Sequence, residues 1–111
     1  MTQKISKCGK LNFDDERVFF NKTHVFAMVV KNPVLPGHVI ICPKVPVQRY
    51  GDLSTEQLFE LSLSVQFITK VVGEGSTDKS CTISIQEGLG AGKNLDHLHV
   101  HIIPRTNDDK Y

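Results

Sequence analysis

The sequence His97-Leu98-His99-Val100-His101-Ile102-Ile103, within residues 96–104, decides the fold of this 111-residue chain because it alternates two kinds of side chain. A β-strand points successive side chains to opposite faces, so the alternation places three imidazoles on one face and aliphatic residues on the other. The aliphatic face belongs to a hydrophobic core, and the imidazole face borders a polar cleft or solvent. The pattern therefore predicts a half-buried strand over residues 96–104.

Three histidines on one strand face suit either metal binding or nucleophilic catalysis. Alternate strand residues lie about 6.7 Å apart, so His97 and His101 are about 13 Å apart, too far to share a zinc ion with Zn–N bonds of about 2.0–2.1 Å. Two neighbouring histidines with the distant His38 remain an alternative metal site. In the second chemistry, the middle imidazole attacks phosphorus while its neighbours donate hydrogen bonds to the phosphate oxygens. The spacing favours this chemistry, with structural or surface histidines as the remaining alternative.

The segment before the histidine strand is rich in glycine and polar side chains. Residues 81–86 alternate apolar and polar side chains, which predicts a strand whose polar face ends at Gln86. Three glycines within residues 88–92 let a backbone approach a ligand closely, although glycines also form ordinary turns. Lys93 adds a positive charge and Asn94 adds amide donors. We therefore predict that Gln86, Lys93 and Asn94 bind phosphate.

The rest of the chain predicts more strands and one helix. Three short apolar runs predict strands: 17–20, 25–30 and 38–42. Residues 54–72 predict the helix, which Ser54 and Gln57 begin with the spacing of a capping box. Strands and helix occur in blocks rather than in alternation, so the fold class is α+β with an antiparallel sheet.

Two apolar rows run along this predicted helix. The first row is Leu58, Leu61, Val65, Ile68 and Val72, spaced as one core-facing side of a helix. The second row is Phe59, Leu63, Phe67 and Val71. A broad apolar stripe is also normal for a core helix. The second row is therefore either core or the contact with a second copy of the chain, for which a twofold dimer is the commonest arrangement.

The composition is that of one globular domain at residues 1–111, with an N-terminal arm at 1–12 and a C-terminal tail at 106–111. Hydrophobic residues are 40%, charged residues 23%, and the net charge of +1 gives no electrostatic basis for binding nucleic acid. No stretch approaches the roughly 18 apolar residues needed to cross a bilayer, so we expect no membrane association. The three cysteines, odd in number and without a CxxC pair, favour a reducing, cytoplasmic location.

The histidine run resembles the motif of the histidine triad (HIT) family, His-φ-His-φ-His-φ-φ with φ apolar. Residues 36–43 resemble the strand that carries the family's fourth histidine, and residues 84–92 resemble the loop before the motif. Pro104-Arg105 follows the motif as in the fragile histidine triad branch, whose members are dinucleoside polyphosphate hydrolases. The resemblance implies a HIT-like α+β fold with a five-stranded antiparallel sheet, one long helix, and a homodimer with a continuous sheet.

The resemblance also implies roles for the histidines and their neighbours. His99 matches the family nucleophile, and His97 and His101 match the positions that contact the phosphate and the leaving group. His38 matches the fourth histidine of the same cluster. Gln86 falls on the amide that contacts phosphate in the family.

The nucleoside contacts implied by the resemblance lie earlier in the chain. Phe13, Met28 and Ile40 fall where the family packs the base, and ordinary core packing explains the same three residues equally well. Val30 stands where the family has Asn or Asp on the ribose hydroxyls, and Val cannot accept those hydrogen bonds. Asn32, two residues on, is the nearest candidate for the ribose contact.

Together these observations predict a hydrolase that cleaves at the α-phosphate of a dinucleoside polyphosphate or related purine nucleotide through a covalent nucleotidyl-histidine. We expect no resident metal and no required cofactor, with a divalent cation as substrate counterion left open. The first alternative is a purine nucleoside phosphoramidase of the histidine triad nucleotide-binding branch. The second is a nucleotide-binding module with little turnover.

Overall fold

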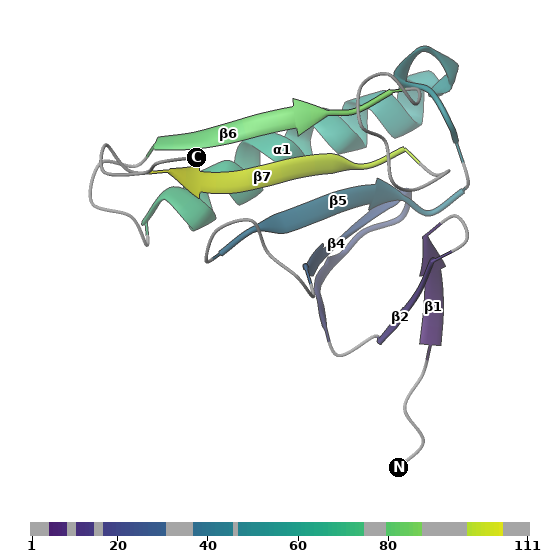
Figure 1. Cartoon of the computed structure of the whole chain (residues 1–111). Coiled ribbons are helices and arrows are strands. Elements are labelled where there is room, and N and C mark those ends of the chain that lie inside the picture. The colour runs from purple at the N-terminus through teal and green to yellow at the C-terminus, as the bar shows by residue number, and fades with distance from the viewer. Residues whose placement is uncertain are drawn as a thin grey trace.

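The structure of the protein, a computed structural model, describes residues 5–8, 11–14, 17–30, 37–45, 47–74, 80–87 and 98–105, with side chains described from Arg17 onward. Its strands are β1 (Ile5–Cys8), β2 (Leu11–Asp14), β3 (Val18–Asn21), β4 (Val25–Val29), β5 (Val39–Pro43), β6 (Ser80–Ile85) and β7 (Val100–Arg105). A short 3₁₀ helix spans Tyr50–Asp52, and the long helix α1 spans Thr55–Glu74. Figure 1 shows α1 lying across one face of the sheet.

Five strands form one antiparallel sheet in the order β3-β4-β5-β7-β6. This architecture confirms the predicted α+β fold with a five-stranded antiparallel sheet and one long helix. Strands β1 and β2 pair separately as a two-stranded sheet, with Ile5 opposite Asp14 and Cys8 opposite Leu11. The predicted N-terminal arm at residues 1–12 did not include this pairing, although Leu11–Asp14 alternates apolar and polar residues.

Helix α1 begins with the capping box that the sequence predicts. The backbone N–H of Ser54 donates to Oε1 of Gln57 at 2.7 Å, and the backbone N–H of Gln57 donates to Oγ of Ser54 at 3.1 Å. The two residues thus satisfy amide groups that have no partner inside the helix. The helix then continues to Glu74, two residues beyond the predicted range.

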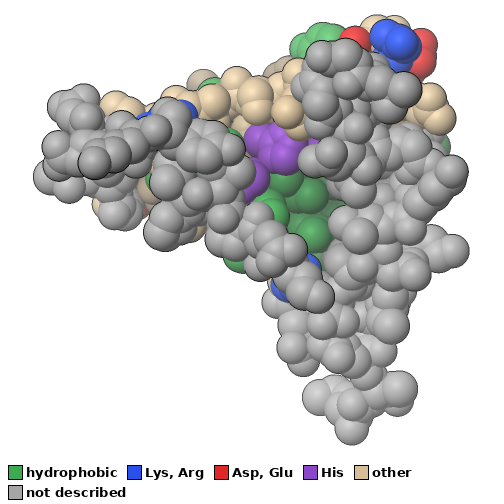
Figure 2. Space-filling view, in the orientation of Figure 1, with side chains coloured by type: hydrophobic (Ala, Val, Ile, Leu, Met, Phe, Trp, Pro, Cys, Tyr) green, Lys and Arg blue, Asp and Glu red, His purple; other side chains and the backbone are tan. Residues whose placement is uncertain are grey.

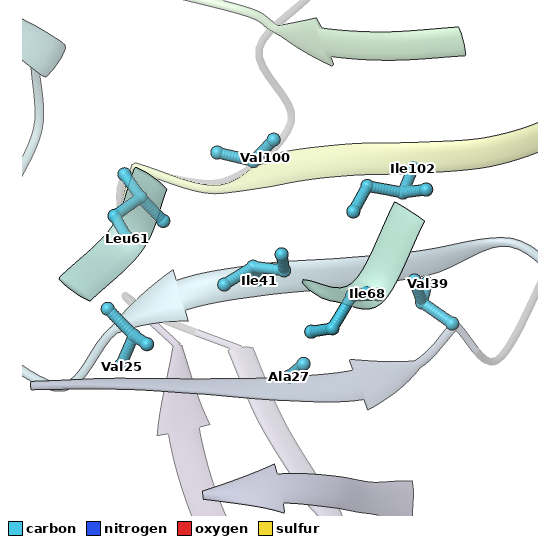
Figure 3. Close-up of a cluster of buried hydrophobic side chains, with 8 residues drawn as sticks. All are labelled: Val25, Ala27, Val39, Ile41, Leu61, Ile68, Val100 and Ile102. Atoms are coloured by element: carbon cyan, nitrogen blue, oxygen red, sulfur yellow. The ribbon is translucent and has the colours of Figure 1, made fainter. Parts of the chain in front are cut away.

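The main core lies between α1 and the sheet, and Figure 3 shows eight of its side chains. Those eight are Val25, Ala27, Val39, Ile41, Leu61, Ile68, Val100 and Ile102. Leu61 and Ile68 come from the first helix row, and the partly buried Val65 and Val72 pack against the same cluster. Leu58, at the start of that row, is exposed.

The second helix row lies outside the core. Its members are 67% (Phe59), 50% (Leu63), 56% (Phe67) and 49% (Val71) exposed. The interpretation of this row as core is therefore wrong, and a continuous apolar stripe faces outward along α1. The ring of Phe67 also stacks on that of Phe20 from β3, with ring centroids 5.8 Å apart.

The opposite face of the sheet carries a row of directly paired residues that crosses four strands. Met28 of β4 pairs with Ile40 of β5, Ile40 pairs with His101 of β7, and Ser84 of β6 also pairs with His101. Paired residues on one face are close neighbours. The register therefore brings a predicted base-binding pair, Met28 and Ile40, next to a motif histidine.

Candidate active site

The strand that carries the histidine motif begins further along the chain than the alternation of residues predicts. The expected strand covered residues 96–104, whereas β7 begins at Val100 and ends at Arg105. Leu98 is fully buried, and its backbone N–H donates to the carbonyl of Val47 at 2.6 Å instead of joining the sheet. His99 therefore follows an anchored residue and immediately precedes the strand, while His97 lies outside the described residues.

Three histidines meet at this point of the fold. Nε2 of His38 lies 2.9 Å from Nδ1 of His101, which is a hydrogen bond. The rings of His99 and His101 are in edge contact, with centroids 4.6 Å apart at an interplanar angle of 70°. His38 precedes β5 and His101 lies on β7, so the pairing of these two strands brings them together. The structure thus places His38, His99 and His101 together, whereas His97, the fourth histidine of the predicted cluster, lies outside the described residues.

Burial and mutual repulsion keep two of these imidazoles neutral. Burial lowers the pKa of His38 below its ordinary value, and the nearby positive charge of a protonated His99 lowers it further. Burial, followed by the charges of His99 and His38, lowers the pKa of His101 to about 4. Near neutral pH, His38 and His101 are therefore both neutral, each ring carries one proton, and one of these two protons lies in the hydrogen bond between them.

One atom of the cluster has no protein partner among the described residues. Nε2 of His101 is buried and makes no hydrogen bond to them. A buried polar atom without a partner costs free energy, so a ligand or water that bonded to it would recover that cost. The atom opposite it on the same ring, Nδ1, is already engaged by His38.

Apolar side chains adjoin the histidines on the same face of the sheet. Met28 and Ile40 belong to a second hydrophobic cluster with Phe26 and Cys42, against which Val18 and Val30 pack. Figure 2 shows histidine and hydrophobic side chains side by side in a hollow of the molecule. Val30, which lacks the polar group expected for a ribose contact, thus has a packing role here.

The remaining predicted contacts are only partly described. Gln86 follows β6 and is half-buried, at the end of the strand as predicted. Phe13 lies in β2, opposite Ser6, and its side chain is not described. Lys93, Asn94 and Asn32 lie outside the described residues.

The structure adds a contact near Gln86 that the sequence analysis missed. The carboxylate of Glu87 accepts a hydrogen bond from the backbone N–H of Tyr50, and its other oxygen lies 3.9 Å from Nη1 of Arg49. The partners are 37 residues apart in the chain, so no local spacing signalled the contact. The only available signal was an acidic residue directly after a predicted phosphate ligand.

Within the described ranges, no three or more His, Cys, Asp or Glu side chains are arranged to hold a metal ion. None of the described helical residues forms a helix long and apolar enough to cross a bilayer. The described cluster places a buried ring nitrogen of His101 on the same face of the sheet as the apolar side chains of Met28 and Ile40.

Comparison with known proteins relates this geometry to characterised relatives. The HIT domain family model matches residues 13–108. The chain is 46% identical over 92 residues to a protein of Dictyostelium discoideum named bis(5'-adenosyl)-triphosphatase, covering 83% of this chain and 62% of that protein. It is 35% identical over 101 residues to the bifunctional bis(5'-adenosyl)-triphosphatase/adenylylsulfatase FHIT of Arabidopsis thaliana, covering 91% and 56%. The chain thus spans less than two thirds of the length of these relatives.

Solved structures give the same relationship. Plasmodium falciparum diadenosine triphosphate hydrolase, solved with cyclomarin A, superposes with a TM-score of 0.90 at 29% identity, covering 98% of this chain and 74% of that one. The NitFhit protein of Caenorhabditis elegans has a TM-score of 0.90 at 30% identity, covering 98% and 26%. The motif, the sheet order and these matches agree, and the chain belongs to the HIT domain family, within the branch of the fragile histidine triad proteins.

Proposed function

We propose that this protein is a nucleotide hydrolase that cleaves dinucleoside polyphosphates at the α-phosphate through a covalent nucleotidyl-histidine intermediate. The observation that carries the proposal is the cluster of His38, His99 and His101 directly beside the apolar pair Met28 and Ile40. The cluster supplies chemistry at phosphorus, and the apolar pair supplies a surface for a base. The printed names of the relatives support the same substrate class.

In the proposed first step, a ring nitrogen of His99 attacks the α-phosphorus. A P–N bond forms and the P–O bond to the rest of the polyphosphate breaks, with His97 as donor to the departing oxygen. Water then attacks the same phosphorus, the P–N bond breaks, and a nucleoside monophosphate leaves. For diadenosine triphosphate, the balance is one water consumed and one AMP and one ADP formed.

His38 and His101 prepare the phosphate contact in this proposal. When Nε2–H of His38 donates to Nδ1 of His101, the single proton of the neutral His101 ring resides on its Nε2. That buried atom then donates to a phosphate oxygen, where negative charge develops during attack. The low pKa of His101 supports this role, because a neutral ring keeps one defined tautomer across the working pH range.

The other contacts of the substrate complete the proposed site. We assign phosphate binding to Gln86, Lys93 and Asn94. The nucleoside contacts are Phe13, Met28, Ile40 and Asn32. No cofactor is required for these steps, and a divalent cation enters only as a counterion of the polyphosphate. The proposed location is the cytoplasm, supported by three cysteines, odd in number and without a CxxC pair.

We also propose a homodimer with a continuous sheet. In the five-stranded sheet the outer strands are β3 and β6, so a second copy extends the sheet at one of these edges. Ile83 and Ile85 of β6 are exposed, as is the second row of α1. Exposed apolar side chains at these positions support burial against a second copy.

A substrate comparison tests the proposed activity. Purified protein is given diadenosine triphosphate and, separately, an adenosine phosphoramidate, and the products are separated by chromatography. We expect AMP and ADP from the first substrate at the higher kcat/KM. A higher kcat/KM for the phosphoramidate would assign the protein to phosphoramidases instead. Binding of either nucleotide without turnover would leave a nucleotide-binding module and overturn the hydrolase.

A further inference from the structure

Glu87 contacts a segment that is distant in sequence. Its Oε1 accepts the backbone N–H of Tyr50, and its Oε2 lies 3.9 Å from Arg49 Nη1. The Arg49 side chain is 65% exposed, so the ion pair itself contributes little. The bond from a backbone N–H to a carboxylate is charge-assisted and is the stronger of the two contacts. Glu87 therefore acts mainly as an acceptor for the backbone of residue 50.

The same segment holds the residue before His99. The carbonyl of Val47 accepts the backbone N–H of Leu98 at 2.6 Å, and both side chains are buried. Residues 47–50 thus contact Glu87 on one side and Leu98 on the other. These two residues are the described neighbours of residues 88–97 in the chain.

The anchoring of Leu98 matters because the sheet begins only at Val100. The pairing of β7 with β5 starts at Val100, so cross-strand pairing does not fix the backbone of Leu98 and His99. The hydrogen bond from Leu98 to Val47 supplies a fixed point one residue before the nucleophile. A displacement of about 1 Å at a reacting group costs about a hundredfold in rate. A small shift of residues 47–50 therefore moves Leu98 and, through it, the imidazole of His99.

We propose that Glu87 is a positioning residue for His99, acting through Tyr50, Val47 and Leu98. The inference rests on the proposed function, in which His99 is the nucleophile. Glu87 fixes the backbone at Tyr50 by accepting its N–H. The short helix Tyr50–Asp52 is held by backbone hydrogen bonds, which the N–H groups of Asp52 and Leu53 donate to the carbonyls of Arg49 and Tyr50. The carbonyl of Val47 then fixes Leu98. Glu87 itself touches no reacting atom in this proposal.

The first test compares Glu87→Ala with Glu87→Gln. The alanine variant loses both contacts, whereas the glutamine variant keeps a carbonyl oxygen for Tyr50 N–H and loses only the charge. We expect kcat for diadenosine triphosphate to fall about tenfold or more in Glu87→Ala, with a smaller change in KM. Glu87→Gln is expected to restore most of kcat. Wild-type kcat in the alanine variant would overturn the inference.

Glu60 provides a matched control. Its carboxylate accepts the backbone N–H groups of Thr23 and His24, 37 and 36 residues away, in a hairpin turn of β3 and β4. Glu60→Ala therefore removes the same kind of contact outside the site. We expect a lower Tm for Glu60→Ala with kcat unchanged. The proposal would be overturned if Glu60→Ala and Glu87→Ala lost kcat in the same proportion to their loss of Tm, because Glu87 would then act on stability alone.

Amide hydrogen exchange at Leu98 separates this inference from the proposed function. Opening of residues 47–50 exposes the Leu98 N–H, so we expect its exchange, followed by NMR, to be about tenfold faster in Glu87→Ala. Exchange at this amide is expected to be unchanged in Glu60→Ala. Unchanged exchange in Glu87→Ala would overturn the positioning role whatever the activity. If the wild-type protein showed no turnover, the proposed function would be overturned. The exchange at Leu98 would still show whether Glu87 holds this amide in place.

Discussion

At the scale of single residues, the site combines two hydrogen-bonded imidazoles, those of His38 and His101, with a third ring, that of His99, in edge contact with His101. His38 and His101 are held neutral by burial and by the charge of their neighbours. Their hydrogen bond occupies one nitrogen of each ring, and the ring of His99 contacts that of His101. In the proposed mechanism the three chemically alike rings have different tasks, with His99 as the nucleophile.

The first prediction follows from this division of tasks. His99→Ala removes the attacking nitrogen, so turnover of diadenosine triphosphate is expected to fall more than about a thousandfold. AMP binding is expected to stay measurable by calorimetry, because the apolar pair Met28–Ile40 and the ring of His101 remain. His24→Ala, which changes a histidine outside the cluster, serves as control and should keep wild-type turnover. Substantial activity in His99→Ala would mean that another group is the nucleophile.

The neutral histidines also predict how stability depends on pH. The unfolded chain binds a proton at each histidine near pH 6.5, whereas folded His101 resists protonation down to about pH 4. The contribution of His101 to the free energy of unfolding is thus complete above pH 6.5 and is lost as pH falls toward 4, by at most about 1.4 kcal/mol per pH unit. The lowered pKa of His38 acts in the same direction. Urea unfolding at several pH values measures this slope. His101→Gln should flatten it, and an identical slope in that variant would contradict the assignment.

At the scale of elements, the entry to β5 and the end of β7 are packed tightly together. Gly37 adopts a φ of +85°, and a Cβ at this position would lie 3.0 Å from Cγ of Pro104. The left-handed backbone and the close approach both require glycine here. This contact connects the residue before His38 to the strand that carries His101.

Replacement of this glycine gives the third prediction. Gly37→Ala is expected to lower the free energy of unfolding by about 1–3 kcal/mol, because a non-glycine residue is strained at this φ and its methyl group meets Pro104. Gly51→Ala is the matched control, since a Cβ there would meet nothing within 4 Å and no left-handed φ is involved. Urea denaturation compares the two variants. Equal stability of both would show that the Pro104 contact yields without cost.

The elements also show how far the sequence alone could predict the fold and the site. Alternation and the capping box predicted most strands to within one residue and the start of α1, because these signals are local. The late start of β7 was missed, since Leu98 bonds to Val47, which is distant in the chain. The hairpin of β1 and β2 was missed because Ile5-Ser6-Lys7-Cys8 does not alternate apolar and polar side chains and so carries no strand signal. The histidine cluster was predictable from the motif and its family resemblance, whereas the contact of Glu87 depends on tertiary structure alone.

At the scale of the whole molecule, apolar surface is concentrated on the outside of α1. This surface is the second helix row, which consists of Phe59, Leu63, Phe67 and Val71. The row meets β3 at Phe67, whose ring stacks on that of Phe20. A cavity of about 390 Å³ lies at this junction, lined by Phe20, Lys22, Glu60, Leu63, Ser64 and Phe67. Apolar side chains scattered singly are normal on a monomer surface, whereas a contiguous row of four supports the proposed contact with a second copy of the chain.

The last prediction tests whether this row contacts a second copy. A charge at position 67 must be desolvated when the row is buried, so Phe67→Glu is expected to weaken the dimer by at least about tenfold in dissociation constant, measured by light scattering over a dilution series. Gln66→Glu adds the same charge at an exposed neighbouring position outside the row and serves as control.

A second variant is needed because Phe67 also stacks on Phe20. Phe59→Glu changes the most exposed member of the row and leaves that stacking intact, so it separates dimer contact from loss of the internal stacking. The opposite result would be wild-type dissociation constants for Phe67→Glu and Phe59→Glu together with a weakened dimer for Ile83→Lys on β6. The two copies would then meet through the β6 edge, and the helix row would have another role.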